Sequence, residues 1–269
     1  MDHLSEIISA SRKVRTTIWE MVYRARASHV ASAFSCVDLI SYLYFSKLYN
    51  FSPEVVISER DSVILSKGHA CTAIYATIYH CGIISDADIL SYGQNGSSLM
   101  HHISHKVPGV DFSTGSLGHG LSVSLGLALS DKLEGNQNKR FCILGDGELM
   151  EGSNWEAILL ASHLQLNNLV VFIDFNNLQS LTTVDQTVGI EPIEQKFLSF
   201  DWYSQQLDGH NYLEISNALN HLHPKKPNVI IANTIKGKGI SFIENSVKWH
   251  YKNPSEDEYN NGLKELSRA

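Results

Sequence analysis

The chain has 269 residues, of which 43% are hydrophobic and 18% charged, and its formal net charge is −7. This composition is typical of a globular protein with a substantial core, and the length is compatible with one large domain or two small ones. Because the balance is acidic and no apolar run approaches the length of a membrane span, neither nucleic acid nor a membrane is expected as a partner.

Helices and a short strand are predicted in the first third of the chain. Apolar residues recur at helical spacing over residues 4–25, and a second helix is expected over residues 37–48. Ser62-Val63-Ile64-Leu65 predicts a short buried strand that ends at Ser66-Lys67-Gly68-His69. A helical stretch is expected from Ala70.

The middle of the chain alternates loops, strands and helices. Residues 91–119 contain many glycines and histidines and predict a long loop, which in a compact chain is usually functional. Helices are expected over 121–129, 154–164 and 212–222, and strands over 140–144, 168–174 and 228–233. This alternation predicts an α/β fold with a mostly parallel sheet and helices on both faces. We expect one domain over residues 1–269, with a polar, peripheral stretch from Pro254.

Polar residues follow two of these strands. Gly145-Asp146-Gly147 ends one strand, and Asn176 follows the next strand 30 residues later. Ligands of open α/β sheets bind beyond the carboxyl ends of the strands, so both side chains are expected at one edge. Either motif alone is more often a simple turn, but together a carboxylate and an amide oxygen suit Mg2+ that is also held by phosphate oxygens. The sequence therefore predicts a site for a metal and a phosphate.

At these residues the chain resembles the transketolase family. The resemblance rests on residues 145–152, residues 163–169, the run Ser66 to Ala70, Pro108 to Asp111 and Thr114 to Gly118. It extends from about His29 to His250 and covers only the family's pyrophosphate-binding domain. It implies thiamine diphosphate and Mg2+ as cofactors, and a chain that is the N-terminal subunit of a split transketolase.

The resemblance also implies a role for each matching residue. The expected catalytic contacts come from four histidines, namely His29, His69, His102 and His250. The metal ligands are expected to be the side chains of Asp146 and Asn176 and the backbone carbonyl of Leu178. The expected cofactor contacts are His69, Gly115, Leu117, Asp146, Gly147, Glu148, Asn176, Lys236 and His250. Glu151 and Glu156 match acids at the family's dimer interface, although taken alone they would be read as solvated helix acids.

Departures from the family pattern lie on the expected substrate side. They surround His29 and His102, and they include His119 and the run Ser180-Leu181-Thr182. We expect an intact cofactor site and a sugar that differs from the pentose phosphates of central metabolism, for example a modified or nucleotide-linked sugar.

A second chain is also implied, because no segment matches the family's pyrimidine-binding and C-terminal domains. We expect that chain as partner, in a heterotetramer, with activity only in the pair. Another thiamine diphosphate enzyme, such as an acyloin synthase or a 2-oxoacid dehydrogenase component, and a non-catalytic scaffold subunit remain alternatives. The four cysteines form no C-x-x-C pair and residues 1–6 lack the features of a signal peptide, so a cytoplasmic protein is expected.

Overall fold

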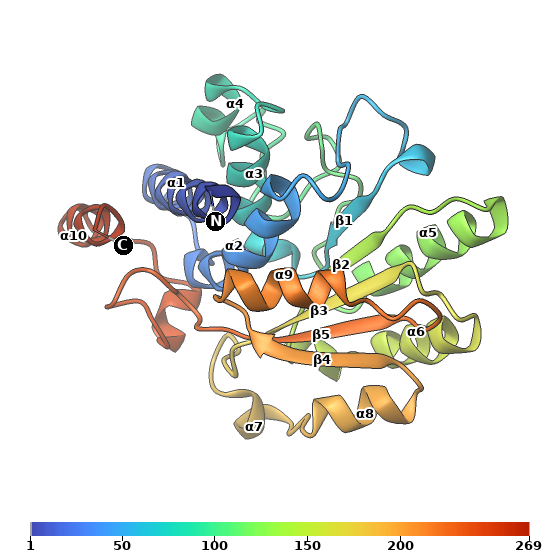
Figure 1. The fold of residues 1–269 in the computed structure, drawn as a ribbon. Helices are drawn as coiled ribbons and strands as arrows, with labels where there is room; N and C mark the ends of the chain where they lie inside the picture. The colour runs from blue at the N-terminus through green and yellow to red at the C-terminus, as the bar shows by residue number, and fades with distance from the viewer. Residues whose placement is uncertain (1, 269) are drawn as a thin grey trace.

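A five-stranded parallel sheet lies at the centre of the computed structural model, which describes residues 2–268 (Figure 1). The strands are β1 (Ser62–Leu65), β2 (Arg140–Gly145), β3 (Leu169–Phe175), β4 (Tyr203–Asp208) and β5 (Asn228–Asn233). They are ordered β1-β2-β3-β5-β4, and every neighbouring pair is parallel. The predicted parallel α/β architecture is confirmed.

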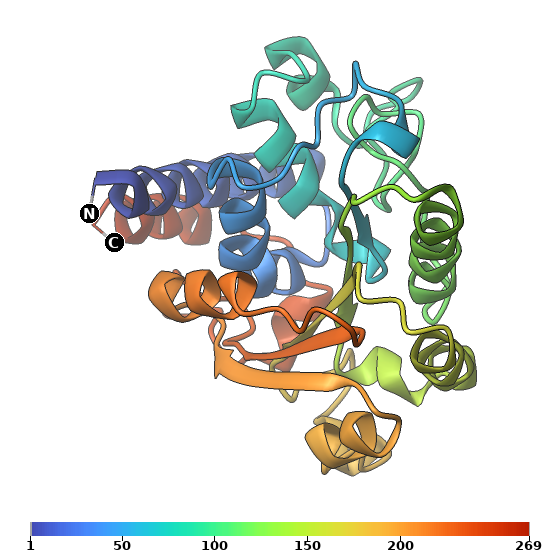
Figure 2. The ribbon, with the colours of Figure 1, turned by 45° about the vertical axis from the view of Figure 1, so that its right-hand side comes forward.

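Helices cover both faces of this sheet, as Figure 2 shows from a second side. The helices are α1 (Asp2–Ala25), α2 (Val30–Phe45), α3 (Cys71–His80), α4 (Asp86–Ser91), α5 (Gly120–Glu134), α6 (Gly152–His163), α7 (Val184–Thr187), α8 (Ile193–Ser199), α9 (Tyr212–Asn220) and α10 (Glu256–Leu266). Single 3-10 turns are formed by Ile57–Glu59, Gly68–Ala70, Gly147–Met150 and Val247–His250.

The alternation of side chains along the strands creates two cores. Phe141 and Phe172 pack with α1, α2, α3 and α9 on one face of the sheet. Cys142 and Val171, on the opposite side of the same strands, pack with α5, α6 and α8 on the other face. Because successive strand residues point to opposite faces, both faces of β2 and β3 are apolar and buried. This explains why these strands read as continuous apolar runs in the sequence.

The C-terminal region is more structured than expected. α10 is amphipathic and lies beside α1, and the two helices are seen together in Figure 2. The indole of Trp19 donates a hydrogen bond to the carbonyl of Tyr259 at 3.0 Å, and Gly262 lies so close to Trp19 that a Cβ there would be 2.6 Å from the ring. Tyr23 and Tyr259 stack with ring centroids 4.0 Å apart. Residues 256–266 are polar and lie at the edge of the molecule, as expected, but they form a helix that packs on α1, which was not predicted.

The elements differ from the predictions in several places, and α5, for example, ends at Glu134 rather than at residue 129. The second helix begins at Val30 rather than at residue 37, directly after His29, whose left-handed backbone (φ 70°) turns the chain into the helix. The short helix α4 was not predicted. Residues 183–208 also lacked a prediction, and they contain α7, α8 and the edge strand β4.

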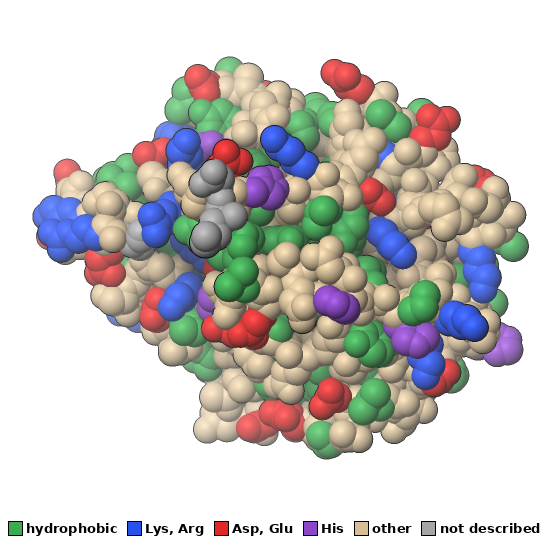
Figure 3. Space-filling view, in the orientation of Figure 1, with side chains coloured by type: hydrophobic (Ala, Val, Ile, Leu, Met, Phe, Trp, Pro, Cys, Tyr) green, Lys and Arg blue, Asp and Glu red, His purple; other side chains and the backbone are tan. Residues whose placement is uncertain are grey.

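The surface agrees with the charge balance of the sequence. On the face that Figure 3 shows, acidic and basic side chains are interspersed and do not gather into a field of one sign. Among residues 2–268, none of the helices combines the length and the apolar character needed to cross a membrane.

Candidate functional site

A cavity of about 450 Å3 opens at the carboxyl edge of the sheet. The strand register places the ends of β2, β3 and β5 side by side there, with Gly145 opposite Asp174 and Asp174 opposite Ala232. The loops that follow these strands meet the start of α2 and the Val247–His250 turn. The cavity is lined by His29, Ser32, Lys67, His69, His102, Leu117, Gly145, Asp146, Gly147, Glu148, Asn176, Leu178, Gln179, Ser180, Lys236, His250 and Tyr251.

Asp146 is the acidic group at the end of β2. Its carboxylate accepts hydrogen bonds from the backbone N–H groups of Gly147 at 2.7 Å, Asn176 at 3.0 Å and Asn177 at 2.5 Å. Burial, followed by the charge of Asp174, raises the pKa of Asp146 to about 6, while the N–H groups of Gly147 and Asn177 lower it. A nearby cation would favour the charged form of this buried carboxylate.

The loop after β3 presents two further oxygen atoms. The side-chain Oδ1 of Asn176 accepts a hydrogen bond from Leu178 N at 3.1 Å, and its Nδ2 faces the protein interior. Asn177 has a left-handed backbone (φ 62°), a conformation that asparagine tolerates better than most residues. This turn directs the chain so that Leu178 reaches the cavity.

A buried lysine bridges this loop and the Val247–His250 turn. Lys236 Nζ donates to the carbonyls of Leu178 at 2.8 Å and Gln179 at 3.0 Å, and it lies 3.1 Å from His250 Nδ1. Burial, followed by the charge of Lys67, lowers the pKa of Lys236 to about 8. The carbonyl of Leu178 keeps a second lone pair beyond the one that Lys236 uses.

Four of the residues that line the cavity are histidines, and they form a cluster. The ring centroid of His29 lies 5.2 Å from that of His69, 6.0 Å from that of His102 and 5.0 Å from that of His250. Burial is the first cause that lowers all four pKa values, to about 4 for His29 and about 3 for His250. The rings are therefore neutral at pH 7 and can donate or accept hydrogen bonds without adding positive charge.

The remaining predicted residues lie at different distances from this cavity. Leu117, Gly147 and Glu148 line it. The carboxylate of Glu148 is already hydrogen-bonded within the protein: it accepts hydrogen bonds from Ser66 Oγ and from the backbone N–H groups of Gly118 and Gly145.

Three predicted residues lie outside the lining. Gly115 is exposed beside His102, with 3.9 Å between its ideal Cβ position and the imidazole. Glu151 is exposed directly before α6, and Glu156, within that helix, lies outside the cavity as well.

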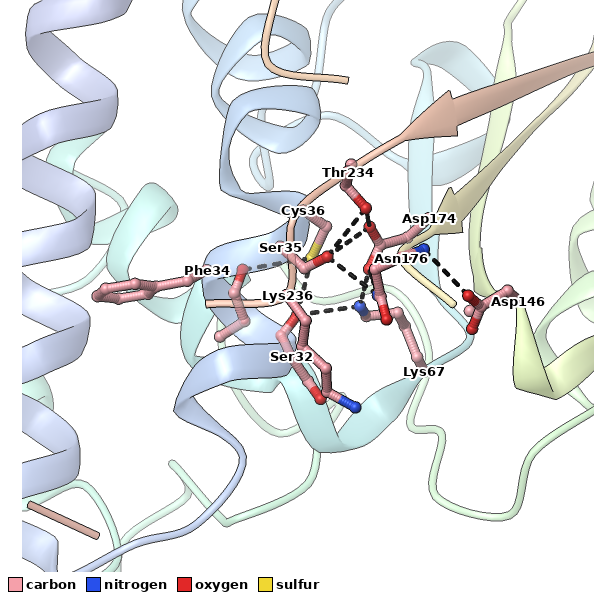
Figure 4. A network of polar contacts seen from close by, with 12 residues as sticks. Ser32, Phe34, Ser35, Cys36, Lys67, Asp146, Asp174, Asn176, Thr234 and Lys236 are labelled. Carbon is pink, nitrogen blue, oxygen red and sulfur yellow. Dashed lines mark hydrogen bonds and ion pairs between the residues drawn. The ribbon is translucent and has the colours of Figure 1, made fainter. Parts of the chain in front are cut away.

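Sequence reasoning missed the polar network beneath the cavity, which Figure 4 shows. Asp174 is fully buried at the end of β3, where it pairs with Lys67 and accepts hydrogen bonds from Ser35, Thr234 and Asn176. One sign of this network was present in the sequence, because Lys67 belongs to the run Ser66-Lys67-Gly68-His69. Its partner Asp174, however, is 107 residues away in the chain. Tyr251, Ser32, Gln179 and Ser180 also line the cavity without having been predicted as site residues.

The donor set fits Mg2+ that is shared with a phosphate. Among the residues that the structure describes, no group of three or more His, Cys, Asp or Glu side chains could hold a metal ion. Asp146, Asn176 and the Leu178 carbonyl instead offer one charged and two neutral oxygens, all at one end of the cavity. Mg2+ in proteins is commonly held by one or two carboxylates together with phosphate oxygens and water. Gly147, which has no side chain, also lines the cavity.

Known proteins resemble this chain in sequence and in fold. A family model described as transketolase, thiamine diphosphate binding domain, matches residues 6–266. One of the subunits of the apulose-4-phosphate transketolase of Actinobacillus succinogenes is 39% identical over 240 residues, covering 88% of this chain and 87% of that protein. The 6-deoxy-6-sulfo-D-fructose transketolase subunit SqwG of a Clostridium species is 33% identical over 259 residues, covering 95% of this chain and 94% of that protein.

A solved structure resembles the whole chain. The transketolase from Campylobacter jejuni superposes with a TM-score of 0.91 at 27% sequence identity, covering 97% of this chain and 42% of that one. The chain thus corresponds to nearly the full length of the two relatives above, but to about two fifths of the solved transketolase.

Proposed function

Because this chain belongs to the transketolase family, in which it corresponds to the thiamine diphosphate-binding domain, we propose that it is the N-terminal subunit of a two-chain transketolase. The pair would transfer a two-carbon ketol (glycolaldehyde) unit from a ketose to an aldose. The observation that carries this proposal is the cavity at the carboxyl edge of the sheet, where the Asp146–Asn176–Leu178 oxygens face a cluster of neutral histidines.

The metal and the diphosphate would be held at the strand ends. We assign the Mg2+ ligands to the side chains of Asp146 and Asn176 and to the carbonyl of Leu178. Gly147, whose N–H already donates to Asp146, would approach the diphosphate with its backbone, and it has no side chain to stand between that backbone and the cavity. Thiamine diphosphate, when bound, supplies the carbanion nucleophile that this chemistry requires.

The histidine cluster would act on the sugar hydroxyls. His29, His69, His102 and His250 are neutral at pH 7, so each can accept a hydrogen bond at one ring nitrogen and donate one from the other. Uncharged rings also avoid repulsion with the metal and with the cationic thiazolium ring. Lys236 would orient His250, because the ammonium donates to its Nδ1 at 3.1 Å and so places the ring proton on Nε2.

A second chain would complete the site. Relatives that are named as single subunits of a transketolase imply a partner chain in their own enzymes. We propose a partner that supplies the pyrimidine-binding and C-terminal domains, in a heterotetramer, with Gly115 and Leu117 facing the aminopyrimidine. Glu151 and Glu156 lie outside the cavity and would contact the other side of the interface.

The sugar is proposed to be a modified one. Relatives of this length are named for apulose 4-phosphate and 6-deoxy-6-sulfo-D-fructose, neither of which is a common pentose phosphate. The residues that depart from the family pattern include Ser180, which lines the cavity, and Leu181, which is 82% exposed and follows it in the chain. A pair that was fastest with xylulose 5-phosphate and ribose 5-phosphate would contradict this part of the proposal.

Calorimetric titration with thiamine diphosphate and Mg2+, with and without the second chain, tests the proposal. We expect tight binding only in the presence of the second chain, and loss of both binding and ketol transfer in Asp146→Ala. Asp201→Ala, which removes an exposed carboxylate that does not line the cavity, serves as the control. Ketol transfer that survived Asp146→Ala would support a scaffold role instead, and activity on a 2-oxoacid without ketol transfer would support another thiamine diphosphate enzyme.

A further inference from the structure

Asp174 is a buried carboxylate with a saturated set of partners. Its Oδ1 accepts hydrogen bonds from Ser35 Oγ at 2.7 Å and from Thr234 Oγ1 at 2.5 Å. Its Oδ2 accepts from Lys67 Nζ and from Asn176 Nδ2, the latter at 3.3 Å. A carboxylate has about four lone-pair directions, so none is left for a cation. Asp174 therefore cannot serve as a metal ligand in this arrangement, although it lies two residues before Asn176.

The same contacts fix which way the Asn176 amide points. Its nitrogen donates to two inward acceptors, Ser35 Oγ at 3.1 Å and Asp174 Oδ2 at 3.3 Å. Its oxygen lies on the other side of the amide and accepts from Leu178 N at 3.1 Å. Since Asp174 can only accept hydrogen bonds when ionised, a flipped amide would place two oxygens against each other. The amide is held with its oxygen on the cavity side, and Figure 4 shows the residues around it.

Lys67 keeps this carboxylate ionised in a buried place. Its side chain is 3% exposed, and its ammonium donates to Asp174 and to the carbonyl of Ser32 at 2.9 Å. An isolated buried carboxylate would become protonated or would repel the neighbouring Asp146. The ammonium of Lys67 offsets part of the negative charge that Asp174 places near Asp146.

We propose that Asp174 and Lys67 are positioning residues for the Mg2+ site: they act through Asn176, whose amide oxygen they direct toward the ion. This inference rests on the proposed function, since it assumes that Asn176 ligates the metal. Hydrogen-bond partners of metal ligands commonly change metal affinity by about 10- to 100-fold when they are removed. A loss in that range is expected for this pair.

Two sets of variants test the role. Asp174→Asn removes the charge while keeping the shape, and Lys67→Met with Asp174→Leu replaces the pair by apolar side chains without changing the net charge. Buried ion pairs often tolerate the latter replacement without loss of stability. Each is also combined with Asn176→Ala. The Mg2+ dissociation constant is measured by calorimetry on the full chain, saturated with thiamine diphosphate and with its second chain present, and thermal unfolding is followed in parallel.

We expect Mg2+ to bind about 10- to 100-fold more weakly in both variants when Asn176 is present, and no further loss when Asn176 is already alanine. An equal loss of Mg2+ affinity with Asn176 present and in combination with Asn176→Ala would show that the substitutions act directly on the ion and not through Asn176. No loss of affinity in either case would show that Asp174 and Lys67 have no role. Each of these results overturns the inference. Unfolding of both variants would assign the pair to folding and would also overturn it. Failure of the wild-type chain to bind Mg2+ in the presence of its second chain is a separate result, which refutes the proposed function itself.

Discussion

Replacement of Asp38 by asparagine is expected to destabilise the chain strongly. Asp38 is 4% exposed on α2 and accepts two hydrogen bonds from Arg15, at 2.7 and 2.8 Å, one from Tyr212 at 2.5 Å and one from His210 at 2.8 Å. Burial would raise the pKa of Asp38, but Arg15 and His210 outweigh it and hold the pKa well below its ordinary value. Asparagine removes the charge and turns one acceptor into a donor.

The magnitude follows from the burial of Arg15. Its side chain is 8% exposed, so Asp38→Asn leaves a buried guanidinium without its counter-charge, which costs about 3–5 kcal/mol. A chain of this length has an unfolding entropy near 0.6 kcal/mol per kelvin at the midpoint, so Tm should fall by roughly 5–9 °C. Urea denaturation and calorimetry measure the two quantities.

A surface ion pair provides the matched control. Asp201 pairs with Lys226 with side-chain exposures of 74% and 39%, so Asp201→Asn should cost at most about 1 kcal/mol and 2 °C. If Asp38→Asn lowered the stability no more than Asp201→Asn does, the buried network would contribute little and the reasoning would be refuted.

Three further predictions concern the cavity and the surface. The His29 ring should titrate near pH 4 when followed by NMR. Because the unfolded chain takes up the same proton near pH 6.5, the free energy of unfolding should fall as the pH drops from about 6.5 to 4. A His29 pKa near the ordinary value of about 6.5 would contradict this. Gly68→Ala should destabilise the chain by about 1–3 kcal/mol in a urea titration, because the new Cβ would clash with the carbonyl oxygen of Thr114. Gly126→Ala is the control: that position on α5 has open space around it, so the substitution should be neutral or stabilising. Leu160 is 45% exposed on α6, one turn after Glu156, which we place at the proposed interface. Leu160→Asp should therefore leave Tm within about 1 °C yet weaken association with the second chain in sedimentation experiments; unchanged association would place the interface elsewhere.

The parts of the fold that could be predicted from the sequence are those with a local cause. β2 and β3 are buried on both faces, so their apolar runs are visible without knowledge of their neighbours. β4 is an edge strand with the sequence Tyr-Ser-Gln-Gln-Leu-Asp, in which Leu207 alone is buried. Its pairing with β5 supplies its backbone hydrogen bonds, and no periodic pattern reports that pairing.

The candidate site also has a part that could be predicted from the sequence and a part that could not. Asp146 and Asn176 were predicted because a strand–helix–strand unit brings residues 30 apart to one edge. The partners of Asp174 come from residues 35, 67 and 234, which the chain brings together only after folding. His210 likewise joins Asp38 to the N–H of Ile235, beside Lys236. Such contacts depend on several segments at once and leave no local signal.

The position of the cavity residues has a consequence for how the proposed site could change. The groups assigned to the metal follow strands whose register is set by backbone pairing, and a one-residue slip would turn Asp174 away from Lys67. Gln179, Ser180, Leu181 and Tyr251 lie in loops and carry no part of the sheet. Changes in these loops leave the strand ends in place. If the proposed function holds, a change of sugar would require new residues in these loops only, and the strand ends proposed to hold the cofactor would stay as they are.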